Sequence, residues 1–195
     1  ITIKNLLVDS TDAEDALNIV NSNINISGLR IVNAVSDGLD CDFCEGSITH
    51  SSAENINGDA FDFSGSKLDM FGIDVKDVRD KAFSVGEKSL AAINKASAVN
   101  VGVALAAKDS SKIYAQTLEV KDFKLHAAMT YQKKPIFGKD SSIIIEKSNI
   151  EGTSAFKRQF GSTLLVDGIP ITESEVSVTE LYTEGIMKKW AKNLD

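Results

Sequence analysis

Aspartate recurs at a fixed spacing in the first third of the chain. Asp15, Asp37 and Asp59 lie 22 residues apart, and Asp40 and Asp62 repeat the same interval. Carboxylates that a fold brings together can hold Ca²⁺ through their oxygens, or act as the acid and the nucleophile of glycoside hydrolysis. The same spacing also suits solvated turn residues, because Asp favours turns and its charge aids solubility.

These aspartates define the first candidate site. Asp37, Asp40, Asp59 and Asp62 are candidates for catalysis and for calcium binding, and calcium is the only cofactor that we expect. Asp42 lies two residues beyond Asp40 and joins Asp40 and Asp62 as a candidate glycan-binding residue. We expect Asp40 and Asp62 to face outward, where water keeps both carboxylates ionised.

A second candidate is the longest segment between repeats, YQKKPIFGKD at residues 131–140. Loops that leave a rigid scaffold often carry recognition, so Tyr131, Lys133 and Lys134 are further candidate binding residues. A core position for Tyr131 and simple solvation of the two lysines are equally compatible with the sequence.

The cysteines form a C-x-x-C pair, a spacing that redox pairs and zinc half-sites use. The chain has no second pair of cysteines and only two histidines, His50 and His126. We therefore interpret Cys41 as a buried thiol and Cys44 as a thiol in a turn.

Composition excludes two classes of partner. The chain of 195 residues has a formal net charge of -7 and no basic stripe that would neutralise phosphates, so we expect no nucleic acid partner. No apolar run approaches the roughly 20 residues needed to span a bilayer, so we expect no membrane insertion. The start at Ile1, without a signal peptide, suggests a processed piece of a longer protein.

The aspartates belong to a repeat that predicts their scaffold. The segment INISGLRIVN places apolar residues at Ile24, Ile26, Leu29 and Ile31, and LDMFGIDVKD and IYAQTLEVKD repeat that spacing. Degenerate copies bring the total to seven, mostly 20 to 24 residues apart, and most are followed by a further alternating apolar pair. Three short strands in a turn of about 22 residues are typical of a parallel β-helix.

The repeat predicts an all-β fold, a parallel β-helix of about seven coils over residues 1–152. A leucine-rich repeat would need the register L-x-x-L-x-L-x-x-N, which is absent, and a β-sandwich would not keep a constant period. We assign residues 153–195 to a C-terminal cap with strands, a turn at Asp167–Gly168 and a short amphipathic helix. The apolar side of that helix comprises Leu181, Ile186, Trp190 and Leu194.

The period also predicts which residues stack. Residues 22 apart should lie directly above one another, about 4.8 Å apart. Leu39, Phe61 and Phe83 then stack inside the tube, and Asp40 and Asp62 stack outside it.

The repeats resemble a right-handed parallel β-helix domain of the pectin-lyase-like superfamily. Polygalacturonase-type glycosidases on this fold carry N-T-D-G, then G-D-D about one coil later, then G-H-G and R-I-K. Ser36-Asp37-Gly38 is similar to the first motif and Gly58-Asp59-Ala60 to the second, although Ala60 replaces one essential carboxylate. The next coil has Lys81-Ala82-Phe83 without a histidine, and no R-I-K occurs. The resemblance implies right-handed coils, with Asp37 and Asp59 as the matching catalytic-type positions.

These observations favour a non-enzymatic β-helix module, structural or glycan-binding, that is part of a larger extracellular or surface protein. Its partners would be a polysaccharide or other segments of the parent protein. One alternative is a carbohydrate-active enzyme, a polysaccharide lyase or glycoside hydrolase that uses the acidic coils. Another is a module that assembles end to end.

Overall fold

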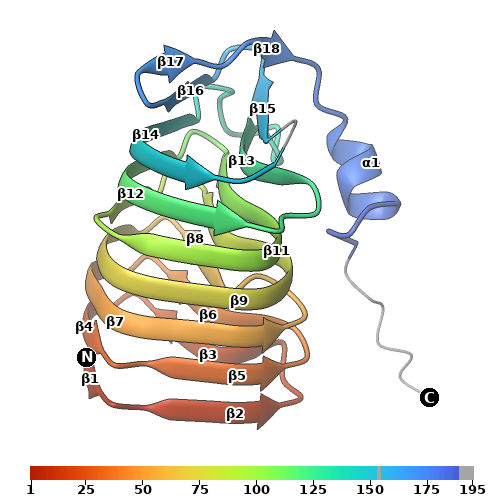
Figure 1. Cartoon of the computed structure of the whole chain (residues 1–195). Coiled ribbons are helices and arrows are strands. Elements are labelled where there is room, and N and C mark those ends of the chain that lie inside the picture. The colour runs from red at the N-terminus through yellow and green to blue at the C-terminus, as the bar shows by residue number, and fades with distance from the viewer. Residues whose placement is uncertain (153–154, 189–195) are drawn as a thin grey trace.

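The computed structural model describes residues 1–152 and 155–188. The chain winds into a parallel β-solenoid of about seven turns with a period of about 22 residues, which confirms the predicted fold class (Figure 1). On the near face in Figure 1 the strands run from left to right while the chain climbs from the red N-terminus toward the blue end, so the coil is right-handed.

The strands pair in parallel throughout the stack. In chain order those of the coils are β1 (Thr2–Lys4), β2 (Leu7–Thr11), β3 (Asp15–Val20), β4 (Asn23–Ser27), β5 (Arg30–Ala34), β6 (Asp37–Asp42), β7 (Glu45–Ile56), β8 (Phe61–Ser64), β9 (Lys67–Gly86), β10 (Leu90–Ile93), β11 (Ala96–Lys108), β12 (Lys112–Lys121), β13 (His126–Tyr131) and β14 (Ser142–Ile150). The last elements are β15 (Phe156–Gln159), β16 (Thr163–Val166), β17 (Ile169–Pro170), β18 (Glu173–Ser174) and the helix α1 (Val178–Thr183).

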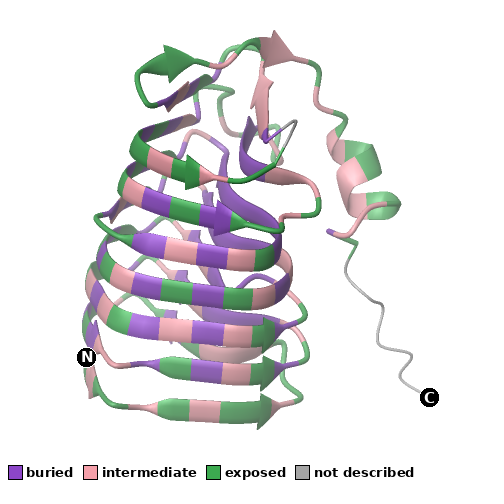
Figure 2. Ribbon diagram, in the orientation of Figure 1, coloured by how far each residue is buried: buried purple, intermediate pink, exposed green. Residues whose placement is uncertain are grey.

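The predicted register is confirmed. Leu39 pairs with Phe61 and Phe61 with Phe83, while Asp40 pairs with Asp62 on the same strands. The rings of Phe61 and Phe83 stack with centroids 5.6 Å apart. Because strand side chains alternate, the first column fills the core and the second faces outward. Figure 2 shows this alternation of buried and exposed residues along the strands of the near face.

One corner of the coil is made by single residues with positive φ. Asn33, Asn55, Asp77, Asn100 and Asp122 occupy it in successive coils, with φ between 53° and 58°. Asn and Asp tolerate this conformation better than other residues that carry a side chain. The column is linked by hydrogen bonds, because the Asn55 amide donates to Asn33 at 2.7 Å and the Asn100 amide to Asp77 at 2.6 Å.

A second, smaller core lies outside the tube. The outward residues Val103, Ala106, Met129 and Tyr131 of β11 and β13 are buried together with Met187. The segment that includes α1 covers them, and Figure 1 shows α1 beside the stack rather than above its last coil. This segment borders the site described below.

The C-terminal region continues the stack before it turns back. β15 pairs with β13 and β16 with β14, both in parallel. β16 and β17 form an antiparallel hairpin around the predicted turn at Asp167 and Gly168, whose φ angles are 52° and 78°. Among the described residues, no helix is long and apolar enough to cross a bilayer.

The terminal helix is shorter than the amphipathic pattern suggests. α1 has 6 residues, and the Ser177 hydroxyl caps it by accepting a hydrogen bond from the Glu180 amide at 3.5 Å. Leu181 and Ile186 pack against the second core. The other two residues of the predicted apolar side, Trp190 and Leu194, lie outside the described residues.

Candidate functional site

The predicted aspartates gather on one side of the tube, on β3, β6 and β8 and in the turn just before β8. Two adjoining hollows of about 440 and 460 Å³ open there and share Glu14, Asp37, Asp62 and Lys133 in their walls. We call the two together the acidic groove. Its central residues are Asp37, Asp40, Asp62, Lys108, Lys133 and Tyr182.

Asp37 and Asp59 form a buried ladder at the floor of this groove. Their exposed fractions are 8% and 6%, so neither is a solvated turn residue. The Asp37 carboxylate accepts a hydrogen bond from the Asp59 amide at 2.7 Å, and the Asp59 carboxylate accepts one from the Lys81 amide at 3.0 Å. A Cβ atom at Gly58 would lie 2.0 Å from Asp37 Oδ1, so this close approach requires glycine.

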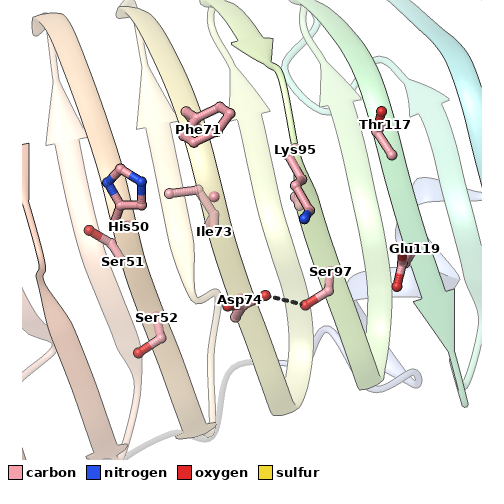
Figure 3. A pocket seen from close by; sticks show the side chains of 12 residues that line it. His50, Ser51, Ser52, Phe71, Ile73, Asp74, Lys95, Ser97, Thr117 and Glu119 are labelled. Atoms are coloured by element: carbon pink, nitrogen blue, oxygen red, sulfur yellow. Dashed lines mark hydrogen bonds between the residues drawn. The ribbon is translucent and has the colours of Figure 1, made fainter.

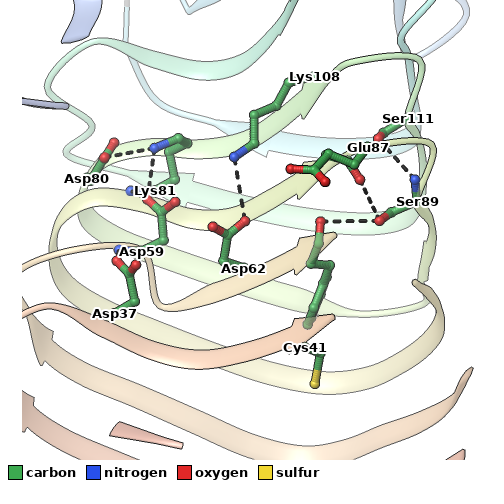
Figure 4. A network of polar contacts seen from close by, with 12 residues as sticks. Asp37, Cys41, Asp59, Asp62, Asp80, Lys81, Glu87, Ser89, Lys108 and Ser111 are labelled. Atoms are coloured by element: carbon green, nitrogen blue, oxygen red, sulfur yellow. Dashed lines mark hydrogen bonds and ion pairs between the residues drawn. The ribbon is translucent and has the colours of Figure 1, made fainter. Parts of the chain in front are cut away.

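Lys81 lies between two of the buried acids (Figure 4). Its Nζ atom is 2.9 Å from Asp59 Oδ1 and 2.7 Å from Asp80 Oδ2, and only 2% of its side chain is exposed. Burial by itself raises the pKa of Asp59, but the charges of Lys81 and Lys108 hold that pKa below its ordinary value. Burial, followed by the charge of Asp59, raises the pKa of Asp80 to about 7. At neutral pH the cluster therefore contains one lysine cation, one carboxylate and one half-protonated acid.

Lys108 neutralises Asp62 across two coils. Its Nζ atom lies 3.5 Å from Asp62 Oδ1, and its stem crosses Gly86, where an added Cβ atom would be 3.1 Å from the Lys108 Cε atom. Burial alone would lower the pKa of Lys108, but the Asp62 charge raises it above the ordinary value. Sequence analysis missed both Lys108 and Asp80, because neither falls in the columns that the aspartate spacing defines.

Asp40 differs from the expectation that water keeps it ionised. Burial, followed by the charges of Asp62 and Asp42, raises the pKa of Asp40 to about 7. The Asn18 amide donates a hydrogen bond to Asp40 Oδ2 at 3.1 Å. Burial raises the pKa of Asp42 as well. The side of the groove away from the lysines is therefore acidic, and its central carboxyl group is about half protonated at neutral pH.

The predicted loop after β13 folds back over the groove. The buried Asp109 carboxylate accepts hydrogen bonds from the backbone amides of Lys133 and Lys134, both at 2.7 Å. Lys134 forms an ion pair with Glu87. The loop therefore brings both lysines to the acidic columns, from which they are far removed in sequence.

Lys133 is held against an aromatic ring. Its Nζ atom lies 4.6 Å from the centroid of Tyr182. Burial, followed by the charges of Lys108 and Lys81, lowers the pKa of Lys133 to about 8. Tyr131, the third predicted residue of this segment, is fully buried, and its hydroxyl lies 2.7 Å from that of Tyr182. The core alternative for Tyr131 is therefore the observed one, and the ring beside Lys133 in the groove is that of Tyr182.

Lysines form ion pairs with two of the carboxylates that calcium would use. Asp59 faces Lys81, and Asp62 faces Lys108. Within the described part of the chain, no group of three or more His, Cys, Asp or Glu side chains is placed to hold a metal ion. Calcium binding at Asp37, Asp40, Asp59 and Asp62 stays a prediction.

The cysteines lie in the core next to the groove. Both are free and fully buried, and Cys44 lies in the turn between β6 and β7, as our interpretation expects. The Cys44 Sγ atom lies 3.4 Å from the Ile19 carbonyl oxygen, and burial raises the pKa of the Cys41 thiol. Protonated, buried thiols are poor nucleophiles and poor metal ligands.

A further hollow, separate from the acidic groove, lies on another face of the tube (Figure 3). Its volume is about 560 Å³, and it extends over β7, β9, β11 and β12 beside His50 and Phe71. The Ser97 hydroxyl donates to Asp74 at 2.6 Å, whereas His50 and Lys95 are exposed. This hollow lacks the buried charges of the acidic groove, which is therefore the stronger candidate site.

Comparisons of the chain with models of protein families, with curated proteins and with solved structures found no match. The class of protein is defined by its architecture, a right-handed parallel β-solenoid with an acidic groove on one side.

Proposed function

We propose that this chain is a glycan-binding β-helix module of the pectin-lyase-like kind, part of a larger extracellular or surface protein. The observation that carries the proposal is the acidic groove, in which Asp40, Asp42 and Asp62 line an open hollow and Tyr182 lines the adjoining one. Carboxylates accept hydrogen bonds from sugar hydroxyls, and an aromatic ring offers an apolar surface to a sugar ring.

The scaffold also suits a repeating ligand. Asp40 and Asp62 are register neighbours, and stacked strands repeat about every 4.8 Å. The groups stand on paired strands over a closely packed core, so they are held in position before a ligand arrives. A polysaccharide could contact several coils in succession.

Calorimetric titration with a panel of soluble oligosaccharides tests this proposal. We expect Asp40→Asn together with Asp62→Asn to weaken binding about tenfold or more, which corresponds to about 1.4 kcal/mol. Asp69→Asn is the matched control, because Asp69 is an exposed carboxylate of β9 outside the groove. The proposal is wrong if no oligosaccharide binds, or if the groove variant binds as tightly as Asp69→Asn.

A carbohydrate-active enzyme is a second candidate, favoured by one observation. Asp40 has a pKa of about 7, while Asp62 in the next coil lies beside the Lys108 cation. Retaining glycoside hydrolases use two carboxyl groups about 5 Å apart, one as acid and the other as nucleophile. In this hypothesis Asp40 protonates the leaving oxygen and Asp62 attacks the anomeric carbon.

The two candidates differ in turnover. The binding module predicts no release of reducing ends or unsaturated sugars from neutral or acidic polysaccharides. The enzyme predicts turnover that falls above about pH 7, as Asp40 loses its proton, and that disappears in Asp40→Asn but persists in Asp69→Asn. Turnover with these properties would replace the binding module by the enzyme.

A further inference from the structure

Asp40 and Lys133 both line the acidic groove, and neither forms an ion pair with another described residue. Three other lysines that line the groove are paired, since Lys81 contacts Asp59 and Asp80, Lys108 contacts Asp62, and Lys134 contacts Glu87. Lys133, by contrast, forms no ion pair in the described chain and has the Tyr182 ring beside it. Asp40 accepts a hydrogen bond from the Asn18 amide but has no cation beside it.

The surroundings of these two groups have opposite sign. Asp40 faces four acids on β3, β6 and β8, which are Asp62, Asp42, Asp15 and Asp37. Lys133 is repelled by two lysines, Lys108 on β11 and Lys81 on β9, and it is also attracted by the charges of Asp62 and Asp59. The groove therefore carries carboxylates without cations toward the first coils, whereas its lysines gather toward the later ones.

We propose that the ligand of the acidic groove is an amphoteric glycan, which presents an amine to Asp40 and a carboxylate to Lys133. The inference rests on the proposed function and specifies its ligand class. A half-buried charge without a partner is costly, and a ligand group of opposite charge removes that cost through a charge-assisted hydrogen bond. Only a ligand that carries both charges satisfies both ends of the groove.

Ligands of uniform charge fit one end and oppose the other. A polyuronate would bring carboxylates toward Asp40, Asp42 and Asp62, and like charges disfavour one another at short range. A polyamine-like glycan would bring ammonium groups toward Lys133 and Lys108. A neutral sugar would cover Asp40 and Lys133 without neutralising either, which increases their desolvation cost.

The inference predicts a maximum of affinity near neutral pH. Asp40 has to be ionised to bind an amine, and its pKa is about 7. Lys133 has to be protonated to bind a carboxylate, and its pKa is about 8. Binding should therefore release a proton at Asp40 and take one up at Lys133. Affinity should fall on both the acidic and the alkaline side of this interval.

The experiment compares four β-linked glucosamine disaccharides that differ only in substituents. Glucosaminyl-N-acetylmuramic acid carries an amine and a carboxylate, chitobiose carries amines only, N-acetylglucosaminyl-N-acetylmuramic acid carries a carboxylate only, and diacetylchitobiose carries neither. By calorimetry at about pH 7.5, we expect the amphoteric disaccharide to bind about tenfold or more tightly than each of the others. A flat pH profile of its affinity would contradict the inference.

Two variants assign the two ends of the groove. Asp40→Asn should no longer bind disaccharides with an amine more tightly than those without one, but should still prefer those with a carboxylate. Lys133→Gln should lose the preference for the carboxylate and keep that for the amine. Thermal melting checks that each variant folds, and Asp69→Asn should keep both preferences. If diacetylchitobiose binds as tightly as the amphoteric disaccharide, the ligand class is wrong while glycan binding stands. If none of the four binds, the glycan-binding proposal fails as well.

Discussion

Lys108 extends two coils along the stack, and its Nζ atom lies 3.5 Å from the Oδ1 atom of Asp62. The side chains of the pair are 7% and 23% exposed. The stem of Lys108 can cross the intervening coil because Gly86 has no side chain there. This contact ties the acidic columns of the first coils to the later coils.

Replacing Lys108 by methionine should destabilise the fold by about 3 kcal/mol, because a mostly buried carboxylate then loses its cation. Chemical denaturation measures the loss. The double variant Lys108→Met with Asp62→Asn should recover part of it, since no unpaired charge remains. Additive losses in the double variant would show that the two residues do not interact in solution.

Phe61 tests the packing of the core. It is fully buried, and its ring stacks on that of Phe83. Phe61→Ala should cost about 3–5 kcal/mol in chemical denaturation, because it removes buried surface and leaves a cavity. Ile136→Ala is the control, because Ile136 is 86% exposed and should cost less than about 0.5 kcal/mol. A loss below about 1 kcal/mol for Phe61→Ala would contradict the register.

Asp40 and Asp80 make stability fall as pH rises toward neutrality. Each has a folded-state pKa of about 7, above the ordinary value of 3.8 for an aspartate. The folded state therefore binds more protons than the unfolded state between these values, so the free energy of unfolding decreases with pH in this interval. The decrease is complete once pH exceeds the folded-state pKa.

The variant Asp40→Asn separates the contribution of Asp40 to this pH dependence from that of Asp80. Asp40→Asn should lose less stability than the wild type between about pH 5 and about pH 8, as measured by urea denaturation. Asp59 does not interfere, because its pKa is lowered and its contribution changes only in more acidic solution. If Asp40→Asn loses as much stability as the wild type between these two pH values, the Asp40 carboxyl group is already ionised in the folded protein at about pH 5.

Calcium binding makes a prediction with its own pH dependence. If Asp37, Asp40, Asp59 and Asp62 bind Ca²⁺, a concentration of about 5 mM should raise the melting temperature through selective binding to the folded state. The rise should be larger at about pH 8 than at about pH 6, because Asp40 has to be ionised to bind a cation. Asp40→Asn with Asp62→Asn should remove it. An unchanged wild-type melting curve would eliminate the metal site.

The sequence alone determined the coil, its period and most of the register. Leu39, Phe61 and Phe83 were assigned to the core, and Asp40 and Asp62 to the outer face, and both assignments are confirmed. The physical reason is that a strand alternates its side chains and a solenoid stacks residues one period apart. Regular spacing in the chain therefore translates directly into neighbours in space.

The charge state of the groove was decided by tertiary structure. Asp62 pairs with Ser84 and Ser84 with Ala106, so the period aligns Asp62 with Ala106, and Lys108 reaches Asp62 from two residues farther along β11. Tyr182 reaches Lys133 because the C-terminal segment folds back along the tube. A pKa depends on burial and on charges within a few ångströms, whatever their distance in sequence. Spacing could therefore place Asp40 on the outer face, but only the packed chain provides the burial and the neighbouring acids that raise the pKa of its carboxyl group to about 7.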